Sequence, residues 1–222
     1  MAEARARRQR RPVALILAAL LGVASLALVL AACGGGSSAS SDPLVGYWIG
    51  AGKGAQMTMV QITRDGDTYK VLTNPDNDAG AAKKEGDSLV LESHAVKTTI
   101  TAAPQDKLRL EFSGEMFKQP VGVTLSRVTE AQYKDGAVAF GLIAVRRGLA
   151  MWKAGGGKKY PPAQEVGPQG ILAKMISWPV NLFSDSPMVL QASTGDYTYA
   201  PTQGGKSYTL KGYLSDGSTI GR

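Results

Sequence analysis

The hydrophobic pattern of this chain changes its period at Thr129, and no single type of element accommodates both halves. Before it, over 44–128, apolar residues alternate with polar ones, strictly so in Lys107–Phe112, which predicts short strands. After it, apolar residues recur every three or four positions from Glu130 to Lys153, which predicts one amphipathic helix. We therefore expect a β-rich part followed by a part that contains a long helix.

Seven short strands are predicted over 44–128. Their ranges are Val45–Ile49, Gln56–Thr63, Thr68–Thr73, Ser88–Ser93, Lys97–Thr101, Lys107–Phe112 and Val121–Leu125. Asp65-Gly66-Asp67 is typical of a tight hairpin turn between two of them. In the second range the apolar phase slips between Met59 and Val60, which we interpret as a β-bulge. This many short strands fit a small barrel or a sandwich.

The predicted helix from Glu130 to Lys153 opens the second part. Its apolar stripe comprises Val138, Leu142, Val145 and Leu149, with Phe140, Ile143 and Met151 alongside. Three internal glycines weaken it as an isolated helix, so it must be stabilised by packing. Gly155-Gly156-Gly157 ends it, and Tyr160-Pro161-Pro162 turns the chain away.

The N-terminal segment has the order of a secretory signal. Five arginines lie between Arg5 and Arg11, and an uncharged, Leu/Ala/Val-rich run extends from Pro12 to Ala32. The tetrapeptide Leu30-Ala31-Ala32-Cys33 resembles the bacterial lipobox, in which an aliphatic residue and two small residues precede a cysteine. This resemblance implies diacylglycerol on the Cys33 thiol, cleavage of the signal peptide (1–32) and acylation of the new amine, as with palmitate.

An uncleaved signal anchor is the alternative, because the apolar run can cross a hydrocarbon core of about 30 Å. Both hypotheses place the arginines in the cytoplasm and the residues after the apolar run outside it. Cys33 is the only cysteine, so no intramolecular disulfide is possible. Residues 33–43 are expected to be a Gly/Ser-rich tether with a reach of about 15–20 Å. The expected location is the extracytoplasmic face of the cell membrane, or the outer membrane where there is one.

The composition excludes several classes of function. Without residues 1–32, 20 Lys/Arg stand against 17 Asp/Glu, so the net charge falls from +7 to +3. Such a charge, without a basic stripe interleaved with aromatics, predicts no nucleic-acid partner. His94 is the only histidine and Cys33 is already assigned, which excludes catalytic triads, Cys–His dyads and His-based zinc sites. We therefore expect neither an enzyme nor a cofactor.

Polar motifs elsewhere are better explained as loops and turns. The run Asn74-Pro75-Asp76-Asn77-Asp78 with Glu85 resembles part of an EF-hand loop, but Ala79 occupies the position of the sharp-turn glycine. Gly50–Gly54 and Gly155–Lys159 lack the spacing of a phosphate-binding loop. No metal site is predicted at any of them.

The remaining candidates are carboxylates, a histidine and tyrosines. Asp65 and Asp67 flank a glycine, which turn preference explains, and His94 ends a predicted strand as an ordinary polar residue. Four tyrosines either form an exposed aromatic face for a partner or pack within a sheet: Tyr197, Tyr199, Tyr208 and Tyr213.

Two resemblances concern the folded parts. Val45-Gly46-Tyr47-Trp48 resembles the Gly-x-Trp start of lipocalin-like barrels, in which the tryptophan closes the barrel floor. It implies a lipocalin-like β-domain at 44–128, although Trp48 as an ordinary core residue is the alternative. The order of motifs from Trp152-Lys153 to Asp216-Gly217, over residues 130–220, resembles the globular part of type II secretion pseudopilins and type IV pilin-like proteins. This resemblance implies an α+β domain at 129–222 with a helix packed on an antiparallel sheet.

The pilin-like resemblance rests on the order of several motifs. They are Trp152-Lys153, Tyr160-Pro161, Trp178-Pro179-Val180-Asn181, Ser186-Pro187-Met188, Gly195-Asp196-Tyr197-Thr198-Tyr199, Tyr208-Thr209-Leu210-Lys211-Gly212-Tyr213 and Asp216-Gly217. The apolar N-terminal helix that polymerises in pilins has no counterpart in this part of the chain. The calcium loop of major pseudopilins is not expected either, because only five residues follow Gly217.

The sequence thus predicts a non-enzymatic, lipid-anchored cell-envelope protein. It would act as an interaction or scaffold module whose pseudopilin-like domain does not polymerise, with the membrane and an envelope protein as partners. One alternative is a carrier that binds a small apolar ligand in the lipocalin-like domain. Another is an accessory component of type II secretion or type IV pilus machinery.

Overall fold

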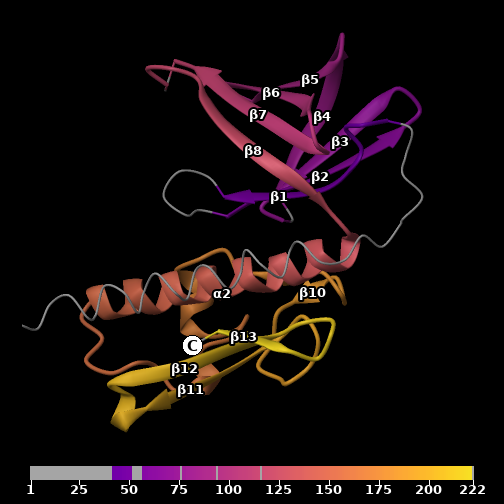
Figure 1. Ribbon diagram of the computed structural model, residues 1–222. Coiled ribbons are helices and arrows are strands. Elements are labelled where there is room, and N and C mark those ends of the chain that lie inside the picture. The colour runs from indigo at the N-terminus through magenta and orange to yellow at the C-terminus, as the bar shows by residue number, and fades with distance from the viewer. Residues whose placement is uncertain (1–41, 52–56, 76, 94, 116, 222) are drawn as a thin grey trace, which may run out of the picture. The chain divides into compact units, whose positions relative to one another are not determined.

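The computed structural model describes residues 42–51, 57–75, 77–93, 95–115 and 117–221 (Figure 1). The predicted signal peptide, Cys33 with the rest of the lipobox, and the tether as far as residue 41 lie outside the described residues, as does His94. The described residues belong to one compact unit that begins at Ala39.

The first part of this unit is a closed, antiparallel β-barrel (Figure 1). Its eight strands are β1 (Gly46–Ala51), β2 (Met57–Asp65), β3 (Thr68–Thr73), β4 (Asn77–Glu85), β5 (Ser88–Ser93), β6 (Val96–Ala103), β7 (Lys107–Gly114) and β8 (Val121–Val128). Each strand pairs with the next along the chain, and β8 closes the barrel by pairing with β1. The predicted barrel is confirmed in its up-and-down form, and the turn at Gly66 and Asp67 joins β2 to β3 as expected.

The strand β4 was not predicted, because its sequence gives no alternating apolar signal. The interior-facing residues that could have marked it are small: Ala82 is buried, and Ala79 packs against the barrel core. The register between β3 and β4 shifts between Val71 and Leu72, and Gly80 supplies a φ of 100° at that point. The polar loop expected here is therefore a bulged strand.

The bulge predicted between Met59 and Val60 is wrong. The pairing of β2 with β1 runs through both residues without a shift, so their side chains point to opposite faces. Val60 belongs to the barrel core, whereas Met59 packs outside the barrel against Tyr133 and Ala137. Both side chains are fully buried because this strand is covered on both faces.

The predicted helix is confirmed as α2 (Glu130–Ala154). A capping box fixes its start, since Thr129 Oγ1 accepts a hydrogen bond from the Gln132 amide at 3.2 Å and Gln132 Oε1 accepts one from the Thr129 amide at 2.9 Å. Its last turn ends at Gly155, whose amide donates to Met151 and Lys153 carbonyls. The helix direction is thus set directly at the end of β8.

A three-stranded antiparallel sheet lies against α2, formed by β11 (Tyr197–Thr202), β12 (Ser207–Tyr213) and β13 (Thr219–Gly221) (Figure 1). Shorter elements connect it to the helix: η1 (Ala163–Glu165), η2 (Ile171–Lys174), β9 (Val180–Asn181), β10 (Ser186–Pro187) and η3 (Gln203–Gly205). A helix packed on a small antiparallel sheet is the coarse arrangement that the sequence predicts.

The core between α2 and the sheet uses the predicted stripe of the helix. Its buried members are Val138, Leu142, Val145, Leu149, Val166, Leu172, Met188, Tyr197, Tyr199 and Leu210. Gly212 lets the sheet approach closely, because a Cβ there would lie 2.5 Å from Val138 Cγ1. The barrel and this sheet share no strand within the described ranges. A domain boundary at 129, with domains at 44–128 and 129–222, stays a prediction.

Candidate functional site

The interior of the barrel is occupied by large side chains. Those with at most 2% of their surface exposed are Leu44, Trp48, Val60, Ile62, Tyr69, Val71, Leu89, Ile100, Leu108, Leu110 and Leu125. Leu44 precedes β1, and the others come from β1, β2, β3, β5, β6, β7 and β8, so side chains from around the barrel meet in one cluster. An eight-stranded barrel has an interior just wide enough for side chains to fill.

Arg127 covers Trp48 at the end of the barrel where the chain enters. Its guanidinium carbon lies 4.1 Å from the centre of the Trp48 ring, a cation–π contact. The same guanidinium donates to the Val45 and Pro43 carbonyls at 2.6 and 2.7 Å and to Asp106 Oδ1 at 2.6 Å. This group of contacts ties β1, β8 and the β6–β7 turn together.

Asp42 is a buried carboxylate at this same end. One oxygen accepts from the Leu44 amide at 3.0 Å, and the other accepts from the Tyr69 hydroxyl and from Arg64 at 3.3 Å. Burial raises the pKa of Asp42, but its hydrogen bonds and the charges of Lys84 and Arg64 outweigh burial and lower it. The first described residues are therefore fixed to the barrel at the point where the predicted tether joins.

Sequence reasoning found Trp48 but missed Arg127 and Asp42. Arg127 lies 79 positions after Trp48, and no local pattern relates a residue of β8 to one of β1. Asp42 was assigned to the tether because it ends a Gly/Ser-rich run. Both could be found only from the closed pairing of the barrel.

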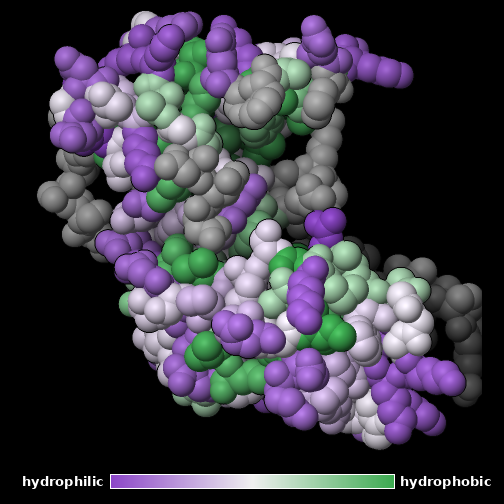
Figure 2. Space-filling model, turned by 180° about the vertical axis from the view of Figure 1, so that it is seen from behind, coloured by the Kyte–Doolittle hydropathy of each residue, from purple (hydrophilic) through white to green (hydrophobic). Residues whose placement is uncertain are grey.

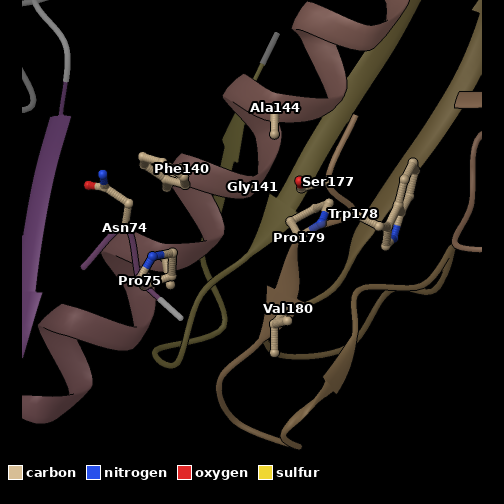
Figure 3. Close-up of a pocket in the computed structure, with 10 residues that line it drawn as sticks. Asn74, Pro75, Phe140, Gly141, Ala144, Ser177, Trp178, Pro179 and Val180 are labelled. Atoms are coloured by element: carbon tan, nitrogen blue, oxygen red, sulfur yellow. The ribbon is translucent and has the colours of Figure 1, made fainter. Parts of the chain in front are cut away.

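A small cleft of about 80 Å³ lies beside the middle of α2 (Figure 3). Its lining residues are Asn74, Pro75, Ala137, Phe140, Gly141, Ala144, Ser177, Trp178, Pro179 and Val180. In Figure 3, Asn74 and Pro75 lie beside Phe140, and residues 177–180 come from the segment that leads into β9. Ligand sites usually enclose about 300–1,000 Å³, so this cleft has room for only a few atoms.

The EF-hand-like run does not gather its oxygens. Asn74 is in a turn, with a φ of 53°, while Glu85 lies at the far end of the extended β4. A nine-residue strand separates its ends by roughly 27–30 Å, which is too far for both to reach one cation. Within the described ranges, no three His, Cys, Asp or Glu residues lie close enough together to hold a metal ion.

The glycine-rich motifs have structural roles where the structure describes them. Gly155–Lys159 closes the end of α2: the Gly157 amide donates to the Trp152 carbonyl at 3.1 Å, and Trp152 Nε1 donates to the Lys159 carbonyl at 2.9 Å. Gly50 belongs to β1, and the rest of its motif lies largely outside the described residues.

The candidate aspartates of the β2–β3 turn, and Asp196 in the second part of the chain, have structural roles. Asp67 pairs with Arg64 at 3.5 Å in the β2–β3 hairpin, next to Asp65. Asp196 is buried and accepts from the Val189 amide at 2.9 Å and from two side chains. These contacts bring no pair of carboxylates together around a shared proton.

The tyrosines follow the sheet-packing interpretation. Tyr197 and Tyr199 are buried under α2 and donate their hydroxyls to the Val166 and Pro161 carbonyls. Tyr208 packs against Tyr199, with ring centres 5.8 Å apart. Burial raises the pKa of Tyr199 to about 12 and raises the pKa of Tyr197 further. The alternative of one exposed aromatic face is wrong.

No protein-family model, no curated protein and no solved structure matches this chain. Within the described ranges, no helix combines the length and the apolar character that a membrane crossing requires. Two features of the described residues are candidates for function: the filled barrel with its Trp48–Arg127 end, and the surfaces of the part built on α2.

Proposed function

We propose that this protein is a non-enzymatic, lipid-anchored protein of the cell envelope that acts as an interaction or scaffold module. The anchor would be Cys33, at the extracytoplasmic face of the cell membrane. The signal-like order of residues 1–32, the lipobox and the lack of a second cysteine support this proposal. The described body begins only nine positions after Cys33, at Asp42, which is bonded to the barrel.

The packed barrel interior is the observation that favours a module over a carrier. Trp48 and Tyr69 together with aliphatic side chains fill the space that a ligand would occupy in a lipocalin-like protein. The Gly-x-Trp start and the closed eight-stranded barrel support a lipocalin-like barrel as a scaffold. The carrier alternative would require this core to open, at the cost of exposing side chains that are now buried.

For the second part, we propose a pilin-like body that does not polymerise. Both ends of α2 are joined to folded structure, one face is covered by the sheet, and Tyr133 and Ala137 pack against the barrel. A helix held in this way is not free to pack into a filament. An accessory role in type II secretion or type IV pilus machinery remains the alternative.

Crosslinking in the native envelope followed by mass spectrometry tests the interaction module. We expect a reproducible protein partner crosslinked to surface residues of the protein, and the Cys33→Ser variant should lose it because it is no longer anchored. Recovery of secretion or pilus components would favour the accessory role. A protein that co-purifies with a stoichiometric small apolar ligand, and crosslinks to nothing, would contradict the proposal and support the carrier.

A further inference from the structure

The helix α2 has two apolar faces, and only one is covered along its whole length. The face with Val138 and Leu149 packs on the sheet core. On the opposite face, Tyr133 and Ala137 pack against the barrel, whereas Ile143 and Met151 farther along are 49% and 41% exposed. Hydrophobic side chains are accordingly visible at the surface among hydrophilic ones (Figure 2). The second half of α2 thus presents an uncovered apolar stripe.

Positive charge lies on this stripe and in the segment that follows it. Residues 136–164 contain no Asp or Glu and carry five cations: Arg146, Arg147, Lys153, Lys158 and Lys159. Arg147 lies on the stripe itself, four positions after Ile143 and four before Met151. Within the described ranges, none of the five cations forms an ion pair with a carboxylate. Lys153 instead donates to the Lys158 carbonyl at 3.0 Å and lies over the ring of Tyr160, which packs on the sheet core. Apolar side chains accompanied by cations without a carboxylate partner are typical of a helix that lies on an anionic membrane surface.

We propose that this surface, Ile143–Arg147–Met151 with the flanking cations, docks on the anionic phospholipids of the bilayer that holds Cys33. The inference rests on the proposed anchor. Asp42 follows Cys33 by nine positions, which limits the body to roughly 30 Å from its attachment point. The 25-residue α2 is about 37 Å long, which is comparable with that reach, so a body held by the tether can turn the second half of α2 toward the same bilayer.

The charges favour lipid over a second copy of the chain. In a two-fold dimer, the same patch would face itself, so the arginines and lysines of one copy would lie near those of the other. An anionic surface instead attracts every one of these cations, and the attraction decays over about 10 Å at 0.1 M salt. Docking should therefore require anionic lipid and weaken as salt rises.

A fluorescent probe on the stripe tests the inference in the full, membrane-reconstituted protein. An environment-sensitive thiol dye is attached to Ile143→Cys, or to Thr209→Cys as the matched control, since Thr209 is exposed on β12 and alternates with residues that face α2. The protein is reconstituted into vesicles of phosphatidylcholine alone or with phosphatidylglycerol. We expect the emission of the dye to shift to the blue only at position 143 and only in vesicles that contain phosphatidylglycerol. High salt should reverse this shift.

Charge variants make the test specific. Replacing Arg146 and Arg147 by Gln is expected to reduce the shift at position 143 by roughly half or more, because two of five cations are lost. The matched change of exposed Lys97 and Lys118 on the barrel should leave it intact. Circular dichroism and thermal melting of each variant verify the fold, since Arg147, Lys97 and Lys118 are exposed and Arg146 is half-buried.

Three results would overturn the docking: equal shifts at positions 143 and 209, a shift that is independent of phosphatidylglycerol, or a shift that follows protein concentration without lipid. The last would establish self-association. Mass spectrometry of the same samples reports acylation of Cys33 separately. Acylated protein without a shift refutes the docking and leaves the proposed anchor intact, whereas a shift with unmodified Cys33 refutes the anchor and supports the docking.

Discussion

The substitution Met59→Ala tests the two-sided burial of β2. Met59 is fully buried outside the barrel, where it packs with Tyr133 and Ala137 of α2, and a Cβ added at Gly136 would lie 3.3 Å from its methyl group. Truncating it removes this contact and leaves a void between the strand and the helix. The neighbouring Val60 is equally buried but on the inner face.

The expected loss is set by the size of the void. Buried Met-to-Ala substitutions cost about 2–5 kcal/mol of unfolding free energy, depending on how far the site collapses. For a domain of this size, each kcal/mol lowers the melting temperature by roughly 2–4 °C, so a decrease of about 4–20 °C is expected. Met57→Ala, at the partly buried edge of the same cluster, should cost less.

Urea unfolding measures the loss, and hydrogen exchange locates it. In Met59→Ala, amides of the first half of α2 should exchange faster than in the wild type. In Val60→Ala, the increase should instead be strongest in β1, β2 and β3 around the barrel core. A loss below about 0.5 kcal/mol for Met59→Ala, as for a surface substitution, would refute burial of Met59 against the helix.

Three further substitutions test the barrel end and the sheet. Gly46→Ala should cost about 1–3 kcal/mol in urea unfolding, because Gly46 has a φ of 141° and a Cβ would lie 2.4 Å from Arg127 Nη1; wild-type stability would contradict this. Asp42 has a lowered pKa, so its contribution to the free energy of unfolding is present above about pH 4 and is lost as the pH falls further. Asp42→Asn should therefore lower stability at pH 7 and make stability depend less on pH in the acid range. An unchanged dependence of stability on acid pH would refute this. Tyr199 has a pKa raised to about 12, so its contribution to the free energy of unfolding is present below about pH 10 and is lost as the pH rises through 12. The Tyr199→Phe variant should therefore lose less stability than the wild type between pH 10 and pH 12. Identical melting temperatures of the two proteins across this range would argue against a buried hydroxyl.

The sequence predicts most of this fold because hydrophobic period is a local property. Alternation in Lys107–Phe112 and the three-to-four spacing from Val138 to Leu149 are both visible without any partner. The strand β4 escapes prediction because Ala79 and Ala82 fill its inward positions with side chains too small to stand out. Hydrophobic periodicity alone cannot reveal a strand whose inward-facing side chains are as small as alanine.

Contacts between distant elements explain the other differences. The adjacent apolar residues Met59 and Val60 suggest a bulge only if one face of β2 is assumed to be exposed to solvent. That assumption is wrong, because α2 covers the outer face of β2. Trp48 is recognisable in the sequence, but its contact with Arg127 depends on closure of β8 against β1. Ile143 lies beside the apolar stripe in the sequence, and only the packing of α2 leaves it exposed.

The modification of Cys33 tests the central proposal most directly. Protein purified from membranes is digested, and its N-terminal peptide is measured by mass spectrometry. We predict a peptide that begins at Cys33 and carries a diacylglyceryl group on sulfur, together with acylation of its amine where the cell performs that step. A protein that retains residues 1–32, with an unmodified Cys33 thiol, would contradict the lipid anchor and establish an uncleaved signal anchor instead.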